Sequence, residues 1–294
     1  MRITDGMRLH SAMSGEATAA SRLNDLTRMA SSGIKVDAPS QDPSAYARIV
    51  KADGQITLMT ARQSNLQQAN ADLNLADTTL SSATDLLTRA HTLALQMANG
   101  DVSAADRSNA AQEINGIRDQ LLGIANTQGI GGSYIFGGSK TTTQPFSSSG
   151  AFQGNDDVKN VEVADGVTAA ANASGAKAFT TIAGGNDVFS DLANFAAALT
   201  TNNLAGITTA IGTTQAGHDQ VVTQRVNVGI QSSRLSSASD VIDSALTTVK
   251  TARGADSDID APAVLSQLTQ TQNAYQQSLA VTKQILSMST FGNG

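Results

Sequence analysis

The stretch MTARQSNLQQANADLNLADTTLSSATDLLTRAHTLALQM, residues 59–97, repeats its apolar residues every seven positions. One row of the repeat is mostly leucine: Met59, Leu66, Leu73, Leu80, Leu87 and Ala94. A second row, three positions further on, is mostly alanine: Ala69, Ala76, Ala83, Ala90 and Met97. Two such rows predict a helix with a coiled-coil seam over about five heptads, in which alanine allows close helix packing. A helix over about 43–99 would be roughly 85 Å long, so we expect an elongated molecule.

The stretch SSGIKVDAPSQDPSAYARIV, residues 31–50, interrupts this helical pattern. Gly33 is a plausible end for a preceding helix, and Pro39 keeps the residue before it out of helical geometry. Asp42 followed by Pro43 is a helix-start signal, because the carboxylate can cap free N–H groups and proline suits the first helical position. We therefore expect a short extended connector over 31–43.

Further helices are expected on both sides of a different central region. Asn99-Gly100-Asp101 ends the long helix, and Ser103 with Asp106 starts another. Near the other end a seam over 235–252 is followed by a break at GADSDIDAP, residues 254–262. A further seam then contains Leu265, Leu268, Tyr275, Leu279 and Leu286 and is interrupted by Gln272 and Thr282. Between them, residues 129–186 are rich in glycine, serine and threonine, and the short alternating runs VKNVEV and AKAFTTI predict strands. Residues 187–215 favour one or two short helices.

Composition and motifs point away from several classes of function. The 294 residues carry a net charge of −6, which argues against nucleic acid or an anionic membrane as the main partner. The chain has no cysteine, so disulfides and thiolate chemistry are excluded. No apolar run is long enough to span a membrane, and the N-terminus lacks the apolar core of a cleavable signal peptide. We expect no membrane partner and no small-molecule substrate.

No motif indicates catalysis, a cofactor or a metal. The three histidines stand far apart, and in GGSYIFGGSK, residues 131–140, Gly138 occupies the position where a phosphate loop requires lysine. Asp256, Asp258 and Asp260 imitate the start of a calcium loop, but Ala261 replaces the required glycine and Gln267 the required glutamate. We expect these aspartates to form a solvated turn that caps the next helix.

Three blocks resemble the bacterial flagellin family: RLNDLTRMASSGIKVDAPSQDPSAYARI (22–49), LLTRAHTLALQMANG (86–100) and DIDAPAVLSQLTQTQNAYQQSLAVTKQILSMS (258–289). The resemblance covers roughly 1–140 and 218–290. GGSYIFGGSKTTTQPF (131–146) and the MRIT start are more similar to the members that join the hook to the filament than to those that build the filament. Two departures are Pro262, which we place in a first helical turn after an Asp260 cap, and the end STFGNG, Phe291 to Gly294 in particular, which lacks the usual apolar terminus.

The resemblance implies a mainly α fold, an elongated multi-helix coiled-coil bundle built from both chain termini with a small β-rich (α+β) inserted outer domain. Residues 1–34 and 262–294 would be terminal helices of an inner coiled coil. Residues 35–138 and 218–261 would form a helical bundle domain that contains most of the connector 31–43, and 139–217 the outer insertion. The connector residues Gly33, Pro39, Asp42 and Pro43 would link the inner and outer layers.

The resemblance also implies a function without enzymatic activity. The chain would be a structural subunit, exported through the flagellar type III apparatus with the help of a chaperone and located outside the cell at the junction of hook and filament. Its partners would be copies of itself in a ring or tube, an adjoining hook-associated protein and flagellin. Three alternatives remain: a filament flagellin, a non-flagellar coiled-coil scaffold, and an enzyme with a lid-like insertion.

One block bears on immune recognition. In strongly stimulating flagellins, the segment aligned with LTRAHTLALQ presents two arginines, a glutamate and a leucine on an exposed helix face to the innate flagellin receptor. Arg89 and Leu93 match, but His91 replaces the second arginine and Thr92 the glutamate. Because a neutral imidazole cannot form the forked contact of a guanidinium, we expect the monomer to activate the receptor poorly.

Overall fold

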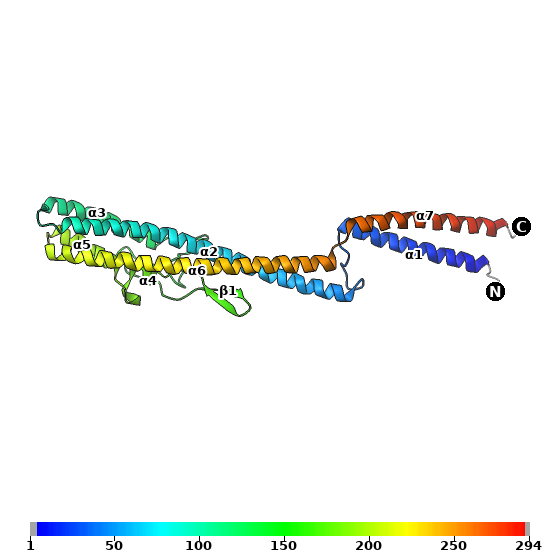
Figure 1. The fold of residues 1–294 in the computed structure, drawn as a ribbon, viewed down its shortest axis with the longest axis horizontal. Coiled ribbons are helices and arrows are strands. Elements are labelled where there is room, and N and C mark those ends of the chain that lie inside the picture. The colour runs from blue at the N-terminus through cyan, green and yellow to red at the C-terminus, as the bar shows by residue number, and fades with distance from the viewer. Residues whose placement is uncertain (1–4, 292–294) are drawn as a thin grey trace. The chain divides into compact units, whose positions relative to one another are not determined.

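The computed structural model of this protein describes residues 5–291, and the side chains of that range apart from 5, 6, 183 and 288–291. In chain order its elements are α1 (Asp5–Ser32), α2 (Pro43–Met97), α3 (Ala104–Ala125), β1 (Asn160–Ala164), β2 (Val167–Ala170), α4 (Gly175–Phe179), the 3₁₀ turn η1 (Thr181–Ala183), α5 (Val188–Thr200), α6 (Leu204–Ser257) and α7 (Ala261–Phe291). Figure 1 shows long helices at both ends of the sequence and a small hairpin in the middle. The predicted mainly α fold with a small inserted β element is therefore confirmed.

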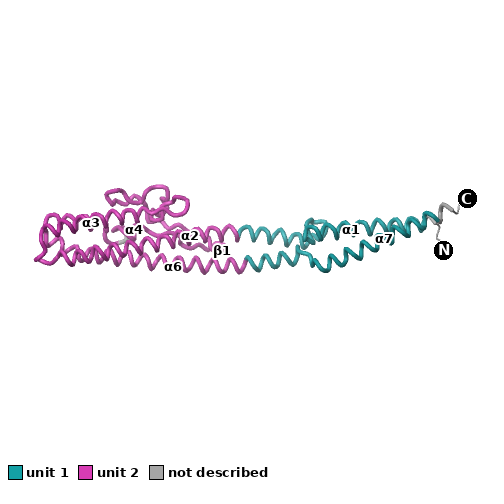
Figure 2. Tube along the Cα trace, turned by 90° about the horizontal axis from the view of Figure 1, so that it is seen from above, with its two compact units in different colours: residues 1–58, 246–294 teal, residues 59–245 magenta. Residues whose placement is uncertain are grey.

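The chain divides into two compact units, coloured in Figure 2. Unit 1 contains residues 1–58 and 246–294, and unit 2 contains residues 59–245. The helices α2 and α6 each contribute to both units. The three-part division expected from the sequence stays a prediction.

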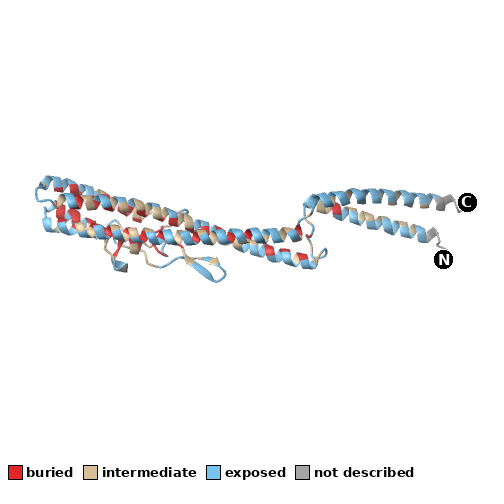
Figure 3. Ribbon diagram, in the orientation of Figure 1, coloured by how far each residue is buried: buried red, intermediate tan, exposed pale blue. Residues whose placement is uncertain are grey.

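In unit 1, α1 packs against α7, and the start of α2 lies beside the end of α6. A small apolar cluster of Val36, Ala45, Ile49 and Tyr46 packs the connector against the first turns of α2. Figure 3 shows that most of the surface of α1 and α7 is exposed.

In unit 2 the seam of α2 forms the helical core together with α3, α5 and α6. The hydroxyl of Ser103 caps α3 by accepting a hydrogen bond from the backbone N–H of Asp106, as the sequence predicts. Beside the helices, the rings of Phe136, Phe146, Phe179 and Phe189 contact one another with centroids 5.1–5.9 Å apart. These rings form the core of the insertion.

The hairpin of β1 and β2 is antiparallel, with Asn160 opposite Ala170 and an irregularity between Glu162 and Ala164. A two-stranded hairpin is marginal by itself in water. Here Arg62 of α2 donates from Nη2 to Glu162 at 2.7 Å and to Asp165 at 2.6 Å, which attaches the hairpin to α2.

Three expectations need correction. The run AKAFTTI forms α4 and η1 instead of a strand, because the hydroxyl of Ser174 caps a helical turn by accepting from the N–H of Lys177. The second half of 187–215 is no separate short helix, since α6 already begins at Leu204. The break expected from residue 254 is shorter, because α6 continues to Ser257 and α7 begins at Ala261.

Candidate functional site

The connector between α1 and α2 is held by backbone hydrogen bonds to the segment between α6 and α7. Gly33 ends α1 with its N–H donating to Met29 O at 2.9 Å and with a φ of +72°, a conformation that favours glycine. The N–H of Lys35 donates to Ser257 O at 2.6 Å, and the N–H of Ile259 donates to Gly33 O at 3.2 Å. The two crossing segments thus form a short antiparallel bridge.

The second half of the connector prepares the start of α2. Gln41 N–H donates to Ala38 O at 3.1 Å, so Pro39 occupies the second position of a turn that suits its fixed φ. Oδ1 of Asp42 accepts from the N–H of Ala45 at 2.9 Å, and Pro43 is the first residue of the helix. These hydrogen bonds hold the pKa of Asp42 below its usual value, since they stabilise the ionised carboxylate.

Two ion pairs between α2 and α6 lie near the bridge. Arg48 of α2 binds Asp256 of α6 through two hydrogen bonds, Nε to Oδ2 at 2.9 Å and Nη2 to Oδ1 at 2.6 Å. The Arg48 guanidinium lowers the pKa of Asp256. Arg253 donates to Asp53 at 2.6 Å, one to two turns further along the same helices. We call the bridge, the Asp42 cap and these ion pairs the connector joint.

The aspartates that imitate a calcium loop each have a separate partner. Asp256 binds Arg48, Asp258 accepts from the hydroxyl of Ser257 at 2.6 Å, and Asp260 accepts from the N–H of Ala263 at 3.1 Å. Asp260 therefore caps α7, with Pro262 in its first turn. Within residues 5–291, no three acidic, histidine or cysteine side chains are placed to share a metal ion.

The predicted seam residues of α2 lie in the interior of the protein. Eight residues of the two rows are each no more than 4% exposed: Leu66, Leu73, Leu80, Leu87, Ala69, Ala76, Ala83 and Ala90. Met59, at the start of the seam, is half-buried. Their role in assembly stays a prediction, because these residues are covered within a single chain.

A row of polar residues on α2, seven positions apart, was missed in the sequence. Gln63 donates to Ser239 Oγ at 2.7 Å and to Asp243 Oδ2 at 3.0 Å. Asn70 and Asp77 also hydrogen-bond to α6, through Ser236 at 3.2 Å and Arg225 at 3.2 Å respectively. Because these polar side chains find partners in the observed antiparallel register of α2 and α6, the polar row favours that register over alignments that would leave them unpaired. The heptad spacing of 63, 70 and 77 was the available signal.

The helices α1 and α7 bury little against each other. Among the described side chains, Leu26 is the only buried residue of α1, and Thr282 is the only one of α7. On α7 the seam position Thr282 is buried, whereas 56% of Leu265 and 46% of Leu286 are exposed in the single chain, so the seam expected there stays a prediction. The final residues 292–294, and the MRIT start at 1–4, lie outside the described residues.

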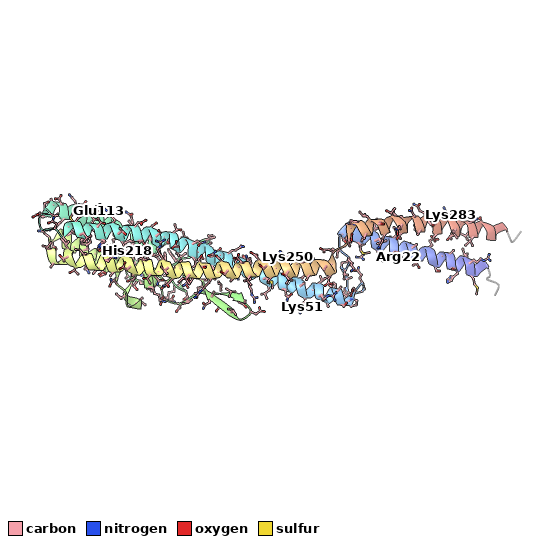
Figure 4. All side chains as sticks on the ribbon, in the orientation of Figure 1. Arg22, Lys51, Glu113, His218, Lys250 and Lys283 are labelled. Atoms are coloured by element: carbon pink, nitrogen blue, oxygen red, sulfur yellow. The ribbon has the colours of Figure 1, made fainter. Side chains whose placement is uncertain are left out.

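The receptor-motif positions do not form one exposed face. Arg89 is exposed and forms an ion pair with Glu113 of α3 at 2.6 Å (Figure 4 labels Glu113). Nδ1 of His91 lies 3.2 Å from Ile211 O of α6, Thr92 is half-buried, and Leu93 is only 3% exposed. Leu93 therefore belongs to the core. Poor receptor activation stays a prediction.

Comparisons with known proteins agree with the observed fold. Residues 5–141 match the family model of the bacterial flagellin N-terminal helical region. A solved structure assigned as a flagellar hook-associated protein from Vibrio parahaemolyticus superposes with a TM-score of 0.67 at 24% identity, over 74% of this chain and 99% of that one. Hook-associated protein 3 from Legionella pneumophila superposes with a TM-score of 0.61 at 18% identity, over 69% and 97%. These two likenesses establish the fold.

Curated relatives share more of the sequence. The chain is 31% identical to flagellar hook-associated protein 3 of Salmonella typhimurium over 62% of its length and 58% of the relative. It is 33% identical to flagellar hook-associated protein 3 of Escherichia coli, over 50% and 46%. The chain thus spans about half the length of the curated relatives it matches. No described helix is long and apolar enough to cross a membrane. The predicted resemblance to the bacterial flagellin family, and within it to hook-associated protein 3, is confirmed by these matches.

Proposed function

We propose that this protein is a structural subunit of the bacterial flagellum that joins the hook to the filament. The observation that carries the proposal is the pairing of α1 with α7. These helices have 28 and 31 residues, yet each has a single buried side chain among those described. The conformational entropy lost by ordering so many residues costs more free energy than the burial of two side chains provides, so the pair needs neighbouring copies to cover it.

The connector joint supports the same role. An assembled subunit must keep its terminal helices and its remaining domain connected at the two points where the chain crosses between them. The bridge at Lys35 and Ser257, with the Arg48–Asp256 ion pair beside it, ties these two crossings together. In this proposal the partners are copies of the chain in a ring or tube, an adjoining hook-associated protein and flagellin. An export chaperone would deliver the chain to the type III apparatus, which places it outside the cell.

The test is deletion of the gene in the motile host. We expect hooks without filaments, with flagellin released into the medium, and recovery of filaments when the gene is restored. A double variant, Arg48→Ala with Asp256→Ala, should restore fewer filaments than the wild type, whereas Lys51→Ala, on the exposed side of α2, should restore them fully. Normal filaments in the deletion strain would refute the proposal.

A filament flagellin is the second candidate, because the chain is also 31% identical to flagellin of Clostridium tyrobutyricum over 37% of its length. Polymerisation separates the two. If the purified protein alone forms long filaments, it is a filament flagellin and not a junction subunit.

A further inference from the structure

Three asparagines of this chain are followed directly by glycine: Asn99, Asn115 and Asn293. Asn293 lies outside the described residues. In an Asn-Gly pair the backbone nitrogen of the glycine can attack the side-chain carbonyl carbon of the asparagine, because glycine has no side chain to block the approach and its backbone is free to turn. The backbone structure around each pair decides whether the two atoms can meet.

The first pair, Asn99-Gly100, lies in the turn between α2 and α3 (Figure 1). Both residues are exposed. Within residues 5–291 the N–H of Gly100 donates to no protein acceptor, and a Cβ placed on Gly100 would meet nothing within 4 Å. Neither a hydrogen bond nor a neighbouring atom therefore keeps this nitrogen from turning toward the side chain of Asn99.

The second pair, Asn115-Gly116, lies in the interior of α3. Inside an α-helix each N–H donates to the carbonyl four residues earlier, and the turns on both sides fix the backbone dihedral angles. The nitrogen of Gly116 can reach the side chain of Asn115 only after this part of α3 has opened, which is unfavourable for a central helical segment. Asn115 is exposed like Asn99, so the two pairs differ in backbone structure and not in access to water.

The turn also supplies a hydrogen-bond donor for the attack at Asn99. The N–H of Asp101 donates to Oδ1 of Asn99 at 3.3 Å. Negative charge develops on this oxygen during the attack, so the donor stabilises the intermediate. The nitrogen of Gly100 gives its proton to water and bonds to Cγ, the bond between Cγ and Nδ2 breaks, and Nδ2 leaves as ammonia. The product is a succinimide ring that contains the backbone carbonyl of Asn99 and its former side-chain carbonyl.

Arg107 of α3 bears on how water opens this ring. Its side chain is buried, and it donates from Nη2 to the backbone oxygen of Asn99 at 2.8 Å, from Nε to Met97 O at 3.1 Å and from Nη1 to Oδ1 of Asn202. All three acceptors are neutral, so this cation has no carboxylate partner among the described residues.

Water can add to either carbonyl of the ring. If it adds to the backbone carbonyl, the oxyanion forms on the oxygen to which Arg107 donates, which stabilises that route. The bond from this carbon to the nitrogen of Gly100 then breaks and leaves isoaspartate, in which the chain continues through the former side chain. Its new α-carboxylate lies beside the guanidinium of Arg107 and gives it a charged partner.

We propose that Asn99 is a site of spontaneous deamidation in the folded protein, and that Arg107 directs its succinimide toward isoaspartate. The modification adds a negative charge and a backbone methylene group to the turn between α2 and α3. The proposal does not depend on the role in the flagellum, since it rests on residues within unit 2 alone.

The test incubates the purified full chain in mildly alkaline buffer for days to weeks and maps its peptides by mass spectrometry, with electron-based fragmentation to separate isoaspartate from aspartate. We expect deamidation at Asn99 to be at least about tenfold faster than at Asn115, because α3 must open first at the second site. In guanidinium chloride, where α3 is unfolded, the two asparagines should react at similar rates. The ratio of isoaspartate to aspartate at residue 99 should be at least about twofold higher in the folded chain than in the denatured chain.

Gly100→Ala tests the attacking nitrogen. Its methyl group hinders the approach, so deamidation at Asn99 should slow by about tenfold or more in the folded chain. The variant should fold, because a Cβ at this position meets nothing within 4 Å, and circular dichroism checks this. Gly123→Ala, in equally open space on α3, is the matched control and should leave the rate at Asn99 unchanged.

Four results would overturn the proposal. Asn99 could keep its amide in the folded chain, or Asn115 could react as fast as Asn99 there. Gly100→Ala could react at Asn99 as fast as the wild type. The isoaspartate ratio at residue 99 could be no higher in the folded chain than in guanidinium chloride, which would remove the role of Arg107.

Discussion

Enlarging the alanine row of α2 tests the seam directly. Ala83 is 0% exposed and lies one turn from Leu80 and one turn from Leu87, which are equally buried. Close-packed cores have no room for the three additional carbon atoms of Ala83→Leu, so side chains must leave their rotamers or the helices must move apart. We expect a destabilisation of about 1–3 kcal/mol.

Thermal unfolding followed by far-UV circular dichroism measures this loss. For a unit of about 190 residues, 1 kcal/mol corresponds to roughly 2–4 °C, so the Tm should fall by about 2–12 °C. Gln67→Leu is the control, because Gln67 is exposed on the same helix and the added residue is the same. The reasoning fails if the Tm of Ala83→Leu is no lower than that of Gln67→Leu.

Three more predictions concern unit 1. The pKa values of Asp37, Asp42 and Asp256 are lowered by hydrogen bonds and arginine partners, so their contribution to stability is present above about pH 4 and is lost as the pH falls through the folded-state values. Amide protection at the connector, measured relative to the intrinsic exchange rate at each pH, should therefore fall below about pH 4, and unchanged protection there would contradict this. Gly33→Ala should destabilise the joint by about 1–2 kcal/mol because of its positive φ. Gly54→Ala, in open space on α2, should stabilise by about 0.5–1 kcal/mol, so chemical denaturation should show shifts of opposite sign for the two variants. Limited proteolysis of the isolated monomer should cut α1 and α7 first, and resistance at both ends would count against assembly-dependent ordering.

Local signals in the sequence predicted the parts of the fold that depend on local chemistry. The heptad rows identified α2 and its buried face, and the Asp42-Pro43 and Ser103 signals identified two helix starts within a residue of those observed. Each of these signals acts within a few residues along the chain, so no knowledge of distant segments is needed.

Contacts between distant segments could not be predicted in the same way. Leu265, Thr282 and Leu286 fit the same helical repeat, yet in the folded chain Thr282 is buried and the two leucines are exposed. The alternation in AKAFTTI indicated a strand, but Phe179 is buried by the aromatic cluster, and the Ser174 cap selects a helical turn. The pairing of Arg48 with Asp256 joins residues 208 positions apart, and neither residue carries a local mark of the other.

The polar row of α2 also bears on how the chain folds. Its pairs with α6 join residues that are 148 to 180 positions apart, and the ion pair at the connector joint closes a longer loop still. The pairing of Arg89 with Glu113, by contrast, spans 24 positions. Because the entropy cost of closing a loop grows with its length, the turn between α2 and α3 should form early. The pairing of α6 with α2 must wait until the whole insertion between them has been synthesised. Because synthesis runs from the N-terminus, α2 stays unpaired with α6 until about 160 further residues have followed, which favours a polar row that disfavours wrong alignments over a seam of leucine alone.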